Sequence, residues 1–149
     1  MRVVLDASVI LKWIFSDSQS EPNVDEAAAL LEAVRAGRIS PLQPPHWLAE
    51  VSAVVTRLRP EIADFAIQLL DGMSLPVDDD IETYRRASRL SRQLNHHVFD
   101  TLYHAVAFER QATLISADDT YTRKASHLGR LVSLSEAHDA IPTASDEEA

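Results

Sequence analysis

Short apolar runs alternate with longer segments of helical periodicity along the chain. Several of the runs are rich in β-branched residues, which is typical of buried strands. They predict strands at residues 2–5, 113–117 and 130–134, a proline-limited extended segment at 39–45, and a brief strand at 74–77. Apolar residues spaced three or four apart predict helices at 9–15, 23–38, 46–58, 60–72, 78–95, 100–111 and 118–129.

Helix-boundary signals support several of these segments. Asn23 is a candidate N-cap with Glu26 three residues later, and Gly37 follows the last turn of that helix. The next predicted helix has one apolar face, made by Leu48, Val51, Val55 and Leu58.

The connections between the predicted strands are too long for hairpins, and most contain a helix. Strands joined in this way pair in parallel, and helices cover both faces of the sheet. The pattern therefore predicts an α/β fold with three layers, α/β/α, around a mostly parallel central sheet. The sequence has no internal repeat and no glycine-rich phosphate loop.

The composition fits one small domain. The 149 residues are 46% hydrophobic, enough for one core, and we expect a single domain over 1–139 followed by an acidic, disordered tail over 140–149. The chain has no cysteine, which excludes structural disulfides and thiolate zinc sites. No signal peptide or membrane-spanning run is recognisable, so we expect a cytoplasmic protein with no membrane partner.

The charge pattern favours nucleic-acid contact at one place only. The net charge of −9 argues against a protein that binds nucleic acid through a broad basic face. One stretch differs, because Arg85, Arg89 and Arg92 recur at helical spacing without an intervening acid. These arginines are candidates for phosphate contact. The alternative is an ordinary solvated helix face, and the sequence leaves both open.

Acidic residues fall where the predicted sheet would bind a ligand, beyond the carboxyl ends of its strands. The candidates end a strand, open a helix or interrupt an apolar helix, and they are Asp6, Glu50, Asp100, Asp118 and Asp119. Each alone has a simpler interpretation, as a helix N-cap or as part of a polar helix face. Clustered carboxylates repel one another unless a cation neutralises them, and an all-oxygen set suits Mg²⁺ or Mn²⁺.

Four segments occur in an order that resembles a known family: VVLDASVILKW, PPHWLAEVSAVV, HVFDTLYHAVA and LISADDTYTRKA. Their acids are separated by 44, 50 and 18 residues. On these motifs the chain, up to about Leu134, resembles PIN-domain ribonucleases, and most of all the VapC-like toxins of bacterial toxin–antitoxin pairs. Two positions depart from the family pattern, since Ser52 stands where Asn is common and Asp119 adds a carboxylate.

The resemblance implies a Mg²⁺- or Mn²⁺-dependent endoribonuclease in which a metal-activated water cleaves RNA phosphodiesters. It implies that Asp6 and Asp100 are the central metal ligands. Asp118 would hold a second metal or act through water. Glu50 would be a further ligand or a base that positions the attacking water.

Other polar residues would support these acids. Ser8, Ser116 and Asp119 are expected to orient the carboxylates, with hydrogen bonds to the local backbone as the alternative for the two serines. His96 and His97 are expected on a loop near the substrate phosphates. The arginines at 85, 89 and 92 would then contact RNA.

The resemblance also implies protein partners. VapC-like toxins pair with an antitoxin that crosses the acidic groove, and they tend to form homodimers. The apolar segment WIF, residues 13–15, and the helices at 46–72 are candidates for such an interface. Trp13 and Trp47 are expected in the core or an interface rather than as base-stacking platforms.

Three alternatives stay open. His97, Asp100 and His104 lie close in sequence and suggest a zinc or iron site, although Glu50 and Asp118 are then unexplained. A non-catalytic, receiver-like signalling or partner-binding module also has a parallel sheet with acids at its edge. It would need paired acids after the first strand and a lysine after a late one, and the sequence has neither. The third alternative is a housekeeping PIN-type nuclease without an antitoxin.

Overall fold

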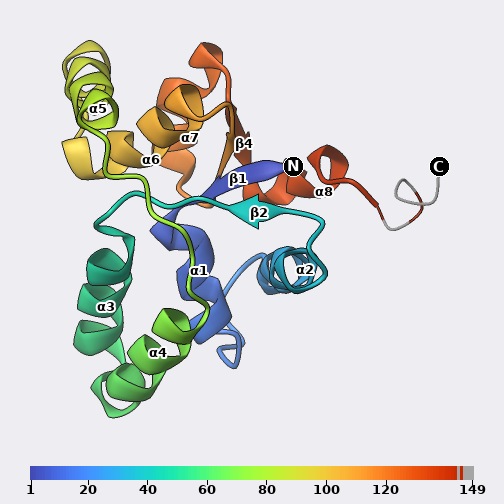
Figure 1. The fold of residues 1–149 in the computed structure, drawn as a ribbon. Coiled ribbons are helices and arrows are strands. Elements are labelled where there is room, and N and C mark those ends of the chain that lie inside the picture. Colours follow the sequence, from blue (N-terminus) through green and yellow to red (C-terminus); the bar gives the residue numbers. More distant parts are fainter. Residues whose placement is uncertain (144, 146–149) are drawn as a thin grey trace.

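The computed structural model of the chain describes residues 1–143 and 145, and its centre is a four-stranded sheet (Figure 1). All pairs of neighbouring strands are parallel, and the strand order is β2-β1-β3-β4. The strands are β1 (Arg2–Leu5), β2 (Ser40–Pro41), β3 (Thr113–Ser116) and β4 (Leu131–Ser133). The predicted parallel sheet is confirmed.

Helices cover the sheet from both sides (Figure 1). On one face α6 contacts β1 and β3 and carries α5, and on the other α1 contacts β3 and carries α2. Helices α3 and α4 pack against each other, and α3 also contacts α1. The α-helices are α1 (Ala7–Ile14), α2 (Val24–Arg35), α3 (Trp47–Leu58), α4 (Pro60–Gly72), α5 (Ile81–Leu94), α6 (Val98–Glu109), α7 (Asp119–Ala125) and α8 (Ala137–Ala140). Two 3₁₀ turns, Ser126–Leu128 and Leu134–Glu136, flank β4.

The core confirms the apolar pattern of the strands. Val3, Val4 and Leu5 of β1 are fully buried, as are the central residues of β3. Trp47 is buried, and Trp13 packs against the core while its indole N–H donates to the Ala27 carbonyl at 2.7 Å. Both tryptophans therefore serve packing.

Three local predictions are wrong. Residues 74–77 form no strand, because the only strand-type pairing of the segment within the described residues is a single bridge between Val77 and Gln43. Asn23 does not cap α2 with its side chain, since its backbone is left-handed, with φ of 57°. Leu58 leaves the apolar face of α3 and is 53% exposed at the helix end.

The side chain of Gln43 extends the pairing of β1 beyond the end of β2. Pro41 and Pro44 cannot donate backbone hydrogen bonds, so the strand is short. Leu42 still donates to the Val3 carbonyl at 2.9 Å. The Gln43 amide then accepts from the Leu5 backbone N–H at 2.9 Å and donates to the Leu5 carbonyl at 2.7 Å. This buried amide thus anchors the last residue of β1.

The single domain over 1–139 stays a prediction. The acidic tail predicted over 140–149 falls partly on residues 144 and 146–149, which lie outside the described residues, while Ala140 closes α8. A membrane-crossing helix would need a longer apolar stretch than any helix in the described part of the chain provides.

Candidate active site

Asp6 lies where β1 passes into α1. Its side chain caps α1 by accepting hydrogen bonds from the Ser8 backbone N–H, at 3.0 Å, and from the Ser8 hydroxyl. The pKa of Asp6 is raised to about 6. Burial raises it most, the hydrogen bonds from Ser8 partly offset this, and the negative charges of Glu50 and Asp100 add to the rise. Asp6 therefore caps α1 and is also close enough to the Glu50 and Asp100 carboxylates to be repelled by them.

Glu50 and Asp100 each lie in the first turn of a helix, Glu50 in α3 and Asp100 in α6. Acidic side chains are stabilised there by the helix dipole. The prediction that Asp100 opens its helix is wrong, because α6 begins two residues earlier at Val98. The two helix starts nevertheless bring both acids within electrostatic range of Asp6.

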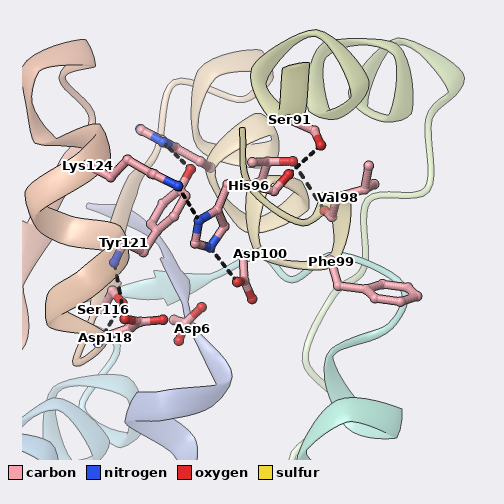
Figure 2. A network of polar contacts seen from close by, with 12 residues as sticks. Asp6, Ser91, His96, Val98, Phe99, Asp100, Ser116, Asp118, Tyr121 and Lys124 are labelled. Atoms are coloured by element: carbon pink, nitrogen blue, oxygen red, sulfur yellow. Dashed lines mark hydrogen bonds and ion pairs between the residues drawn. The ribbon is translucent and has the colours of Figure 1, made fainter. Parts of the chain in front are cut away.

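A histidine four residues earlier pairs with each of these two acids. His46 Nε2 lies 3.1 Å from Glu50 Oε2. His96 Nε2 lies 2.7 Å from Asp100 Oδ2 (Figure 2). The sequence interpretation gave His46 no role and placed His96 only near phosphates. The repeated spacing of a histidine and an acid four residues apart was the signal that would have found both pairs.

Asp118 reaches the same edge of the sheet from β3, the neighbour of β1. Its side chain caps α7 by accepting from the Tyr121 backbone N–H at 3.1 Å. The Asp6 backbone N–H donates to the Ile115 carbonyl at 3.0 Å, so the two strand ends lie side by side. Figure 2 shows the Asp118 side chain next to Asp6. Asp119 is exposed, and its side chain forms no ion pair with the part of the chain that is described.

Ser8 and Ser116 hold this edge together in different ways. The Ser8 hydroxyl donates to Asp6 and accepts from the Ala117 backbone N–H at 2.9 Å, so it links the ends of β1 and β3. The Ser116 hydroxyl accepts from the Asp118 backbone N–H at 3.0 Å. Ser8 thus contacts a carboxylate directly, whereas Ser116 acts on the turn that carries Asp118.

The Tyr103 hydroxyl is a buried polar group at this edge of the sheet. Tyr103 is fully buried one turn after Asp100, and its hydroxyl has no hydrogen-bond partner among the described residues. Burial and the charges of Glu50, Asp6 and Asp100 raise its pKa, while the nearby Ala7 backbone N–H acts in the opposite direction. Tyr103 therefore stays protonated, and a water or ligand among the carboxylates would satisfy its hydroxyl.

The donor set fits a hard divalent cation. Asp6, Glu50 and Asp100 are oxygen donors whose like charges a cation would neutralise. Within residues 1–143 and 145, no three acidic or histidine side chains are placed so that together they could hold a metal ion. Mg²⁺ does not need three such side chains, because it keeps several waters and binds through one or two carboxylates plus substrate phosphates. The residues therefore fit a partly hydrated ion.

The alternative zinc or iron site is not formed. His104 is fully buried, and its ring nitrogens lie 2.8 Å from the Tyr121 hydroxyl and 2.8 Å from the Gly129 carbonyl. Burial lowers the pKa of His104. Both nitrogens are used inside the fold, so His104 has none left for a metal shared with His97 and Asp100.

The three candidate arginines are exposed on α5. Arg85 forms an ion pair with Glu82 at 2.8 Å. Neither Arg89 nor Arg92 has an acidic partner within the described residues. The charge available to an outside ligand is therefore largest at Arg89 and Arg92.

Sequence comparison identifies one family. A family model for the PIN domain matches residues 3–127. A search of curated protein sequences finds no significant match.

The fold is similar to solved structures of toxin–antitoxin proteins. VapBC2 from Rickettsia felis, bound to a DNA fragment from their promoter, is 17% identical with a TM-score of 0.64, and the match covers 89% of this chain and 97% of that one. VapBC-1 from nontypeable Haemophilus influenzae is 15% identical with a TM-score of 0.61, covering 91% and 99%. VapC20 from Mycobacterium tuberculosis, a sarcin–ricin loop cleaving toxin, is 12% identical with a TM-score of 0.60, covering 80% and 94%. At these identities the likeness shows a shared fold.

Proposed function

The chain belongs to the PIN domain family, and from this membership we propose that it is a Mg²⁺- or Mn²⁺-dependent endoribonuclease. The observation that supports this most is the grouping of Asp6, Glu50 and Asp100 around the buried, unpartnered Tyr103 hydroxyl. Asp118 adds a fourth carboxylate at the neighbouring strand end. The family match excludes the alternative of a receiver-like signalling module, because receivers belong to a different family.

The acids have distinct roles in this proposal. A bound divalent ion supplies an activated water and neutralises charge that develops on the phosphate. Asp6 and Asp100 hold the ion, and Asp118 holds a second ion or acts through water. Glu50 joins them as a ligand or orients the attacking water. The Tyr103 hydroxyl donates a hydrogen bond to a water or phosphate oxygen among these acids.

The histidine pairs position two of the acids. His96 fixes Asp100 through a hydrogen bond from its Nε2 atom. His46 Nε2 donates to the Phe99 carbonyl at 2.7 Å and lies 3.1 Å from Glu50 Oε2, so it holds the start of α6 close to Glu50. Such partners hold a carboxylate in one rotamer and lower the cost of ordering it when a ligand binds. We assign both histidines as positioning residues.

We further propose that the chain acts as the cytoplasmic toxin of a toxin–antitoxin pair. Two of the similar structures are of VapBC proteins. The helix pair α3–α4 exposes Leu58, Phe65 and Leu69, which suits a homodimer or antitoxin interface. The segment 13–15 is a poorer candidate than expected, because it packs against the core.

A cleavage assay tests the nuclease proposal. The purified chain should shorten structured RNAs internally with Mn²⁺ or Mg²⁺ but not with EDTA, because the acids need a cation to bind a phosphate. DNA of the same sequence should stay intact. A set of tRNA, rRNA and mRNA fragments that all survive in both metals would contradict the proposal. Growth arrest on induction, relieved by the product of an adjacent gene, separates the toxin from a housekeeping nuclease.

Replacing Arg85, Arg89 and Arg92 together with glutamine should weaken RNA binding and flatten its salt dependence. Each lost phosphate contact lowers the slope of log K against log salt by about 0.7 for single-stranded RNA. Arg85 should contribute least, because Glu82 already neutralises it. The measurement is a titration of labelled RNA at several salt concentrations. An unchanged slope of log K against log salt would mean that these arginines form an ordinary solvated helix face.

A further inference from the structure

A pocket of about 500 Å³ lies beside the acidic site, between the end of α5 and α7. Its lining is polar and cationic, and consists of Ser91, Arg92, Asn95, His96, His97, Thr120 and Lys124. No acidic side chain lines it. The chain has a net charge of −9, whereas this pocket is locally positive, so it favours an anionic ligand.

The two strongest cations of the pocket are free to bind that ligand. Within the described residues, neither Arg92 nor Lys124 forms an ion pair with a carboxylate. The Lys124 ammonium donates to the Asn95 carbonyl at 3.0 Å and lies 3.4 Å from His96 Nδ1. Both side chains are exposed. An anion entering the pocket therefore displaces water rather than an internal salt bridge.

The loop that joins the pocket to the acids is held in place. Asn95 is left-handed, with φ of 49°, and ends α5. The His96 backbone N–H donates to the Ser91 carbonyl at 3.0 Å, and the Ser91 hydroxyl donates back to the His96 carbonyl. Figure 2 shows the His96 ring between Lys124 and Asp100. His96 thus has one nitrogen toward the pocket and the other on a site carboxylate.

We propose that this pocket binds a backbone phosphate of the RNA, next to the phosphate that lies among the acids. The proposal rests on the proposed nuclease function and names a subsite of that same site. Arginine contacts phosphate oxygens bidentately, and lysine adds a compact point charge. A polyanion approaching four carboxylates needs such an anchor, since the acids alone repel it. Arg92 and Lys124 are the residues that contact the phosphate. His96 lies between Lys124 and Asp100 and so fixes the distance between this phosphate and Asp100.

The test measures RNA binding rather than cleavage. A fluorescently labelled single-stranded RNA is titrated in EDTA with the wild-type chain and with the double variant Arg92→Gln/Lys124→Gln. Loss of two phosphate contacts should weaken binding about tenfold and lower the slope of log K against log salt by about 1.4. The matched control is Arg35→Gln/Arg57→Gln, which removes two exposed arginines from α2 and α3. It should change neither value appreciably. Thermal melts of all three proteins exclude misfolding.

Three results would overturn the proposal. One is wild-type RNA binding by the double variant, which is also the result expected if the pocket takes an acidic protein segment. Another is an equal loss in the control variant, which would mean that only total charge matters. The third is specific binding of free phosphate ion to the pocket, measured with inorganic phosphate as the probe. Sub-millimolar binding of phosphate at the amide resonances of Asn95 and Thr120, with RNA affinity unchanged in the double variant, would assign the pocket to the free ion.

The binding test and the cleavage assay can fail separately. If the wild-type chain binds RNA through the pocket but cuts none in any metal, the nuclease proposal is wrong and the phosphate subsite stands. If the chain cuts RNA, and the double variant does so with unchanged KM and kcat, the subsite is wrong and the nuclease proposal stands.

Discussion

Asp6→Asn is expected to abolish RNA cleavage while leaving the metal-free protein at least as stable as the wild type. Asparagine can still cap α1, because its side-chain oxygen accepts the same hydrogen bonds from Ser8. What it removes is a charge that lies in the field of Glu50 and Asp100. The variant therefore loses a metal ligand but also a source of repulsion, which is the trade-off expected at a site built for function.

The stability difference should depend on pH in a definite direction. Burial raises the pKa of folded Asp6 to about 6, above its unfolded value of 3.8, so folding favours the protonated form. That contribution is complete below pH 3.8 and is lost as the pH rises through 6. Above pH 7 the ionised carboxylate destabilises the fold by at most about 3 kcal/mol, at about 1.4 kcal/mol per pKa unit. Asp6→Asn should therefore melt higher than the wild type at pH 8, and the two should converge near pH 4.

Metal should reverse the order of the two proteins. An ion that binds only the folded wild type stabilises it by about 2.7 kcal/mol at 100 times its dissociation constant. For a domain of this size that is roughly 5–10 °C in melting temperature. Asp6→Asn should show little of this shift. Asp64→Asn is the matched control, because Asp64 is exposed on α4 and belongs to no acidic cluster.

Thermal melts at pH 4 to 8, with and without Mn²⁺, and a cleavage assay at pH 7.5 together decide the role of Asp6. If Asp6→Asn melts well below the wild type without metal at pH 8 and still cleaves RNA, Asp6 is a structural cap and no more. The same conclusion follows if Mn²⁺ stabilises both proteins equally.

The strands were predictable because burial on both faces leaves a plain signal in the sequence. Val3, Val4 and Leu5 are apolar without interruption, and only a sheet covered on both sides buries such a run. Asp6 then had two interpretations, as a cap and as a site acid. The structure supports the cap directly and brings two further acids within range of it, so the two interpretations are compatible.

The start of α6 was missed for a physical reason. Val98 and Phe99 are apolar but 41% and 65% exposed, so they break the usual relation between apolar character and burial. His97, the N-cap, makes no side-chain cap hydrogen bond. Because this segment has neither a side-chain cap nor a buried apolar residue, the helix start was predicted at Asp100 instead of Val98.

Gln43→Leu is expected to lower the free energy of unfolding by about 3 kcal/mol. The Gln43 side chain is fully buried and satisfies both backbone groups of Leu5. Leucine fills a similar volume but leaves the N–H and C=O of Leu5 without partners. Each unsatisfied buried group costs about 1–3 kcal/mol. This role could not be recognised from the sequence, because a glutamine between prolines is typical of a loop and its partner lies 38 residues away.

The predicted loss corresponds to a drop of roughly 6–12 °C in melting temperature. Gln93→Leu is the control, because Gln93 is exposed on α5 and the same substitution there should change stability by less than about 0.5 kcal/mol. Urea unfolding of the three proteins measures the difference. Since Leu5 directly precedes Asp6, Gln43→Leu should also reduce cleavage by the fraction of the protein that unfolds, with β1 less firmly held against its neighbour. Equal midpoints for Gln43→Leu and the wild type would mean that water replaces the amide, and that the end of β1 needs no anchor from the segment after β2.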